Sequence, residues 1–143
     1  MNKHIFNATH KNFEEYVLRP SYKQIVFVNF WMAWSKESRQ VNDELEKIHE
    51  KSAEDFILVK VNLGNAPKLA HLCDVTKLPT ILVFDHGRIA NRLVGQEHPY
   101  VLHQFTRKVM LQTGHKPPFQ TGELPEEPRT LSNWFHQLFS TSS

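Results

Sequence analysis

The chain has 143 residues, with 17 Lys and Arg against 15 Asp and Glu, and a formal net charge of +2. This length fits one domain with a short appendage, and the interleaved charges argue against a nucleic-acid-binding surface. The single cysteine, Cys73, can form no internal disulfide and cannot complete a cysteine-rich zinc site. We therefore expect no metal and no cofactor.

Targeting and membrane signals are also missing from the sequence. The first 13 residues lack the apolar stretch and small-residue cleavage site of a signal peptide, and no window is long and apolar enough to span a bilayer. Together with the lone thiol, this predicts a soluble cytoplasmic protein in a reducing compartment, without a membrane partner.

The first half of the chain predicts a strand between two helices. Thr9 is expected to cap a short helix that Pro20 ends, with apolar positions at Phe13, Tyr16 and Val17. Residues 24–31 are apolar on both faces, which is typical of a central strand covered by helices. From Ser35 onward the apolar residues recur at helical spacing (Val41, Leu45, Ile48) and predict an amphipathic helix.

The second half completes a mixed sheet. A strand over 56–62 closes a βαβ unit, whose right-handed crossover makes its two strands parallel. A short helix over 66–73 follows, and the turn Asp85-His86-Gly87 predicts a hairpin of two further strands. A last helix over 99–112 places Leu102, Phe105 and Val109 on one face. We therefore predict an α/β domain over residues 1–113 with helices on both faces of the sheet.

Beyond residue 113 the composition changes. Residues 114–129 hold four prolines and two glycines, which predicts an extended linker. Residues 130–143 are predicted to hold a short amphipathic helix, whose apolar stripe is Leu131, Trp134, Phe135, Leu138 and Phe139. Such a short helix is marginal alone, so the stripe is expected to dock either on its own domain or in a partner's groove.

The run from Val28 to Ser38 resembles the active-site segment of thioredoxin, where a central strand delivers a Trp-Cys-Gly-Pro-Cys turn to a helix. The resemblance extends to Lys60 and Asn62, to Leu78-Pro79-Thr80 in place of the family's cis-proline loop, and to the hairpin turn and closing strand at Asp85-His86-Gly87 and Val94-Gly95. It covers roughly residues 5–111 and implies a thioredoxin fold.

The redox positions depart from that family. Ser35 and Ser38 replace the two cysteines, with Lys36-Glu37 between them, and Asn29 replaces a buried aspartate that the family uses to move protons. A serine hydroxyl neither ionises near neutral pH nor forms a disulfide. Positions 29, 35 and 38 are therefore interpreted as degenerate redox positions, and we expect no catalytic residue and no enzyme activity.

Other chemistry at these residues is less favoured. No histidine stands near Ser35 in the sequence to act as its base, so we interpret Ser35 as a helix N-cap and Ser38 as a solvated residue of the first turn. Cys73 is interpreted as a small apolar side chain on the face of Leu69 and Leu72, because His71 and Asp74 point elsewhere at those helical spacings.

Polypeptide binding does not depend on sulfur. The resemblance implies a surface that grips an extended partner, formed here by Trp34, Leu78 and Pro79, although Pro79 has an equally good explanation as a structural cis-proline. Trp31 is interpreted as core.

We therefore expect a redox-inactive thioredoxin-like protein that binds other polypeptides, as a chaperone, assembly factor or adaptor, with a loose likeness to the bacterial chaperedoxins. One alternative is a thiol-disulfide oxidoreductase whose cysteines have been changed to serine, and another is a structural subunit of a larger complex.

Overall fold

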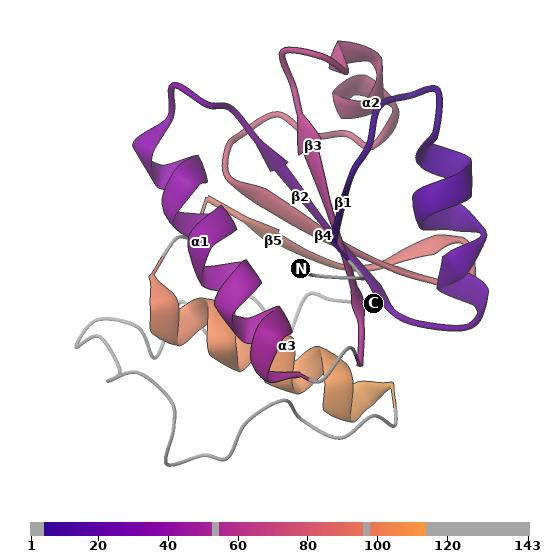
Figure 1. Cartoon of the computed structure of the whole chain (residues 1–143), viewed down its shortest axis with the longest axis vertical. Helices are drawn as coiled ribbons and strands as arrows, with labels where there is room; N and C mark the ends of the chain where they lie inside the picture. Colours follow the sequence, from indigo (N-terminus) through magenta and orange to yellow (C-terminus); the bar gives the residue numbers. More distant parts are fainter. Residues whose placement is uncertain (1–4, 53–54, 96–97, 114–143) are drawn as a thin grey trace.

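The computed structural model describes residues 5–52, 55–95 and 98–113, which form a five-stranded sheet with helices on both faces (Figure 1). The strands are β1 (Ile5–Asn7), β2 (Val26–Trp31), β3 (Ile57–Asn62), β4 (Thr80–Asp85) and β5 (Arg88–Val94). The helices are α1 (Lys36–Lys51), α2 (Pro67–Leu72) and α3 (Pro99–Gln112), and a π-helical turn η1 (Glu14–Leu18) and a 3-10 turn η2 (Pro20–Tyr22) precede β2. The predicted fold class is confirmed, whereas the linker and the C-terminal helix lie outside the described residues.

The sheet has the order β1-β3-β2-β4-β5, so β2 is the central strand, as predicted. β2 runs parallel to β3 and antiparallel to β4, and β4 and β5 form the expected hairpin. β1 pairs in parallel with β3 through three residues only. β1 was not predicted, because a three-residue edge strand is too short to show a period.

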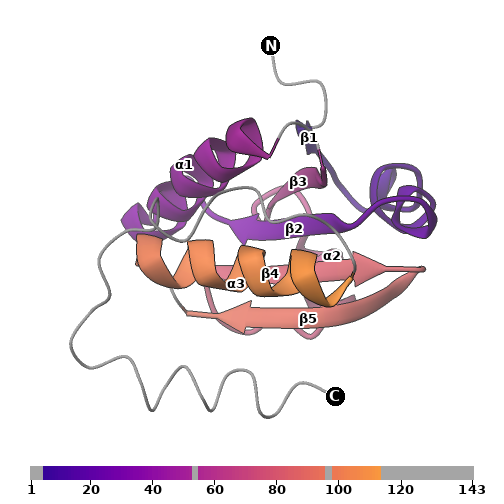
Figure 2. The ribbon, with the colours of Figure 1, turned by 90° about the horizontal axis from the view of Figure 1, so that it is seen from below.

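Each face of the sheet has its own apolar core. α1 and α3 cover one face, where Phe27 packs with Phe56 and Phe105. η1 and α2 cover the other face, where Val26 and Val28 lie. Figure 2 shows α1 and α3 together on one side of the strands. The alternation of neighbouring β2 residues between two buried faces is what an apolar strand covered on both sides requires.

None of the helices in the described ranges is both long and apolar enough to cross a lipid bilayer.

The N-terminal helix begins later than predicted. Thr9 does not cap it: its hydroxyl accepts a hydrogen bond from the Lys11 N–H at 3.3 Å, and its own N–H donates to Asn12 Oδ1 at 2.7 Å. These local bonds form a turn, and helical structure starts only at Phe13. The predicted apolar positions nevertheless face the core, because Phe13 and Val17 are buried.

Candidate functional site at the carboxyl ends of β2 and β3

The candidate site lies where β2 and β3 end and β4 begins, at the upper end of the sheet in Figure 1. The pairing of Phe30 with Thr80 brings the loop before β4 beside the end of β2. The Leu63 N–H donates to the Trp31 carbonyl at 3.0 Å, which holds the segment after β3 against the same strand end. Three segments separated in sequence therefore meet here: the end of β2, the end of β3 and the loop before β4.

Ser35 caps α1, as predicted. It has an extended backbone, and its hydroxyl oxygen accepts the N–H of Ser38 at 3.2 Å. The same hydroxyl donates to Glu37 Oε2 at 3.4 Å. A side-chain cap satisfies one of the N–H groups that a helix start leaves open. The hydroxyl at the first redox position is thus engaged in starting the helix.

Ser38 is not the solvated residue that we expected. It is fully buried, because it lies on the face of α1 that packs against the sheet, together with Asn42, Leu45 and His49. Within the described part of the chain its hydroxyl makes no hydrogen bond, and neither does the buried indole N–H of Trp31. The second redox position is therefore a buried, chemically idle hydroxyl.

The buried amide of Asn29 occupies the position of the family's proton carrier. Its Nδ2 donates to Asn42 Oδ1 on α1, and both side chains are buried. Lys60 is its register neighbour on β3, but the Lys60 ammonium binds Glu46 Oε2 at 3.1 Å instead. A neutral amide cannot take up a proton near neutral pH, so this strand position offers no general base.

Trp34 projects from the turn between β2 and α1, and 75% of its surface is exposed. The turn is held by the Arg39 guanidinium, which donates to the Ala33 carbonyl at 2.5 Å. An exposed tryptophan on a fixed turn offers a large apolar area at little entropic cost. Trp31, by contrast, is half-buried at the strand end.

The Leu78–Pro79 peptide bond is cis, as the resemblance implies. Pro79 is buried, and its carbonyl accepts the Gly95 N–H at 2.7 Å, so neither its ring nor its carbonyl is free for a contact. Leu78 is half-buried, and among the described residues its N–H and C=O make no hydrogen bond. The backbone available to a partner is that of Leu78.

Cys73 is buried in the core beside α2, as predicted, although Leu72 is 75% exposed and does not share that face. Burial raises the pKa of the Cys73 thiol above its ordinary value of 9.0, and the nearby Arg92 guanidinium partly opposes this. Arg92 also donates to the carbonyls of Cys73 and Asp74 at 3.0 and 3.2 Å. No group of three possible metal ligands occurs in residues 5–52, 55–95 and 98–113.

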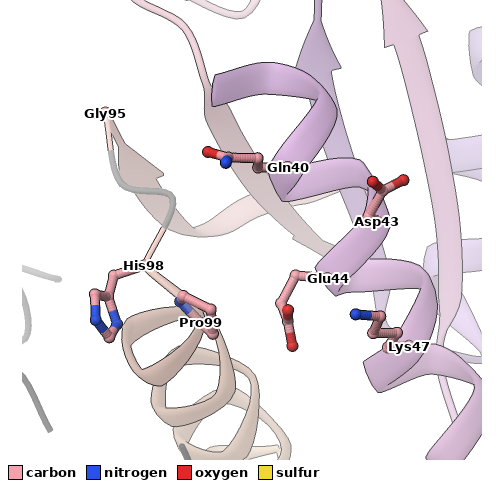
Figure 3. Close-up of a pocket in the computed structure, with 7 residues that line it drawn as sticks. All are labelled: Gln40, Asp43, Glu44, Lys47, Gly95, His98 and Pro99. Atoms are coloured by element: carbon pink, nitrogen blue, oxygen red, sulfur yellow. The ribbon is translucent and has the colours of Figure 1, made fainter. Parts of the chain in front are cut away.

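A separate polar groove of about 580 Å³ lies between α1 and the start of α3 (Figure 3). Its walls are formed by Gln40, Asp43, Glu44 and Lys47 on one side and by Gly95, His98 and Pro99 on the other. Glu44 Oε2 lies 2.8 Å from His103 Nε2, and His98 Nδ1 accepts the Tyr100 N–H at 3.1 Å to cap α3. The groove holds none of the predicted site residues, and its polar groups help to join the two helices.

We compared the chain with known protein families and proteins. The family model of thioredoxin matches residues 4–108. The thioredoxin of Buchnera aphidicola subsp. Acyrthosiphon pisum (strain APS) is 30% identical over 105 residues, which cover 73% of this chain and 94% of that protein. The chain belongs to the thioredoxin family. The thioredoxin of Mycoplasma genitalium is also similar, at 35% identity over 75 residues that cover 52% of this chain and 72% of the relative.

In thioredoxin this turn carries two cysteines. This family member has one cysteine in its whole sequence, Cys73, which lies outside the turn over residues 35–38, called the redox turn below. Positions 29, 35 and 38 were predicted from the sequence, whereas Asn42 and Glu46, which bind Asn29 and Lys60, were not. Asn42 lies on the buried stripe of α1, four residues after Ser38, so helical spacing could have found it. No comparable signal marks Glu46, because a glutamate on a helix is most often solvated.

Proposed function

We propose that this chain is a redox-inactive member of the thioredoxin family that acts by binding other polypeptides, as a chaperone, assembly factor or adaptor. The observation that carries the proposal is the state of the redox turn. Ser35 caps α1, Ser38 is buried, and Asn29 is bound to Asn42, while Trp34 beside them is 75% exposed. The chemistry of the site has been lost and its contact surface has been kept.

The same turn contains no nucleophile for disulfide exchange. That reaction needs a thiolate, and a serine hydroxyl can neither attack a disulfide as a thiolate does nor store two electrons in a disulfide bond. A polypeptide can still pair with the backbone of Leu78 in extended form and cover Trp34 with an apolar side chain. Binding without turnover is therefore the function that these groups support best.

The redox half of the proposal is tested by insulin reduction. The native chain is expected to give no turnover, and the Ser35→Cys/Ser38→Cys variant is expected to give weak turnover because Asn29 and Lys36-Glu37 remain. Turnover by the native chain would contradict the proposal. Strong turnover by the double variant would favour the alternative that family membership suggests, an oxidoreductase whose cysteines have been changed to serine.

The binding half is tested by suppression of client aggregation, with the full chain at stoichiometric excess over a thermally unfolding client. The Trp34→Ala variant is expected to lose suppression, because it removes the largest exposed apolar group of the site. Tyr22→Ala is the matched control: Tyr22 is 60% exposed but precedes the start of β2, at the opposite end of the sheet. Equal suppression by both variants would argue against the Trp34 surface, and no suppression at all would argue against a chaperone role.

A further inference from the structure

We propose that the surface formed by the Trp34 side chain and the Leu78 backbone, called the Trp34–Leu78 surface, selects polypeptide segments in which an apolar side chain is flanked by acidic residues. This inference rests on the proposed function and adds the class of partner to it. It depends on the charges around the surface and on an apolar hollow beside α2. The thioredoxin motifs themselves predict neither feature.

The charges around the surface are mostly positive. The described segments 33–39, 64–78 and 92–95 bring five cationic side chains to this end of the sheet but only two anionic ones, Glu37 and Asp74. The cations are Lys36, Arg39, Lys68, Lys77 and Arg92. In the part of the chain that the structure describes, none of the five forms an ion pair.

The hydrogen bonds of the arginines leave their charge uncompensated. Arg39 donates to the Ala33 carbonyl, and Arg92 donates to the carbonyls of Cys73 and Asp74, so neither guanidinium meets a carboxylate. Near the opposite end of the sheet one arginine is paired with a carboxylate: Arg19 Nη2 lies 2.8 Å from Glu14 Oε2. Cationic side chains without an ion pair, gathered at the candidate site, attract an anionic partner and favour it over a cationic one.

An apolar hollow on α2 lies among these cationic residues. Pro67, Lys68, His71 and Leu72 line an open hollow of about 420 Å³ on α2, and Leu72 is 75% exposed. Lys68 is one of the residues that line this hollow, whose wall is largely apolar. An aliphatic or aromatic partner side chain buries its surface there, while neighbouring carboxylates meet the lysines.

The geometry favours a polypeptide over a nucleic acid. The extended backbone of a peptide can pair with the Leu78 N–H and C=O, which make no hydrogen bond among the described residues. Bases of a single strand need a series of aromatic platforms, whereas Trp34 is the one strongly exposed aromatic residue described in these segments. We therefore commit to an acidic, partly apolar peptide segment.

The test measures peptide affinity for the full chain by fluorescence anisotropy. The probe is a labelled peptide Glu-Glu-Leu-Val-Leu-Glu-Glu, and its matched partner has Lys in place of every Glu. The Glu peptide is expected to bind about tenfold tighter than the Lys peptide at about 50 mM salt, with the difference shrinking at about 500 mM salt because exposed charges are screened. Lys36→Glu/Lys77→Glu is expected to remove the preference.

The control variant is Lys11→Glu/Lys23→Glu, which changes the net charge equally at two exposed lysines outside the surface segments, and it is expected to keep the preference. Equal affinity for both peptides, lost in Trp34→Ala, would overturn this inference and leave the proposed function standing. Binding of neither peptide would contradict both proposals. Displacement of the Glu peptide by an equimolar oligothymidylate would overturn the assignment to a polypeptide.

Discussion

The side-chain amide of Asn29, in the middle of the central strand, donates a hydrogen bond to Asn42 Oδ1 on α1. Both residues are buried, so the pair joins the helix to the sheet directly behind the redox turn. Removing one partner leaves the other buried without its hydrogen bond, which costs more than the bond itself contributes. The pair therefore holds α1 in its place on the sheet.

Asn42→Ala is expected to lower the free energy of unfolding by about 1–3 kcal/mol, measured by urea denaturation. Gln40→Ala, at an exposed position on the same helix, is expected to change it by less than about 0.5 kcal/mol. Replacing both amides, in Asn29→Leu/Asn42→Leu, is expected to cost less than Asn42→Ala alone. A double variant whose loss of unfolding free energy equals the sum of the losses in Asn29→Leu and Asn42→Leu would contradict this account.

The two serines of the redox turn are expected to respond differently to alanine. Ser35→Ala removes the cap of α1 and is expected to cost about 1 kcal/mol of stability, whereas Ser35→Asp keeps an acceptor for the Ser38 N–H and retains most of it. Ser38→Ala removes a buried hydroxyl without a hydrogen bond in the described structure, in favour of a better helix former. It is expected to leave the melting temperature unchanged or slightly higher. Equal losses in both alanine variants would contradict the assignment of Ser35 alone as the cap.

Cys73 is expected to be unreactive in the folded protein. Burial raises its pKa above the ordinary value of 9.0, so the thiol stays protonated where an exposed cysteine has begun to ionise. Alkylation by iodoacetamide, followed by mass spectrometry, is expected to be slow in buffer at neutral pH and fast once urea unfolds the chain. Arg92→Gln removes the guanidinium that opposes the shift and is expected to slow alkylation of the folded protein further. Equal rates in folded and unfolded chains would contradict the burial of this thiol.

The same raised pKa links stability to alkaline pH. Because the folded protein holds the Cys73 proton to a higher pH than the unfolded chain does, this contribution is fully present below pH 9.0 and is lost as the pH rises above that value. The native chain is therefore expected to lose stability relative to Cys73→Ala between neutral and strongly alkaline pH. A difference between the two proteins that does not change with pH would contradict the shift.

The sequence was sufficient for the fold because its signals are local and strong. The two-sided apolar run of β2, the helical spacing of Val41, Leu45 and Ile48, and the Gly87 turn each specify one element. The residues of the redox turn could also be read directly, since a substitution is visible in sequence. Neither the burial of Ser38 nor its idle hydroxyl could be read, because a serine in a first helical turn is usually solvated and only the packing of α1 on β2 decides otherwise. The pairing of Lys60 with Glu46 depends on that packing in the same way, whereas helical spacing already places Asn42 on the buried face of α1.

Restoring the proton carrier is expected to destabilise this protein in a pH-dependent way. Asn29→Asp places a carboxyl where no part of the side chain meets solvent, and Lys60, its register neighbour, is already bound to Glu46. Burial disfavours the charged form, so the pKa of the new carboxyl is expected to lie above its unfolded value of about 3.9. A raised folded pKa means that stability is full when the group is protonated and is lost as the pH rises. The deficit of the variant relative to the native chain, measured by urea denaturation, is therefore expected to grow between about pH 4 and pH 8. A deficit that shrinks over this range would mean that Lys60 turns from Glu46 to the new carboxyl and stabilises its charge.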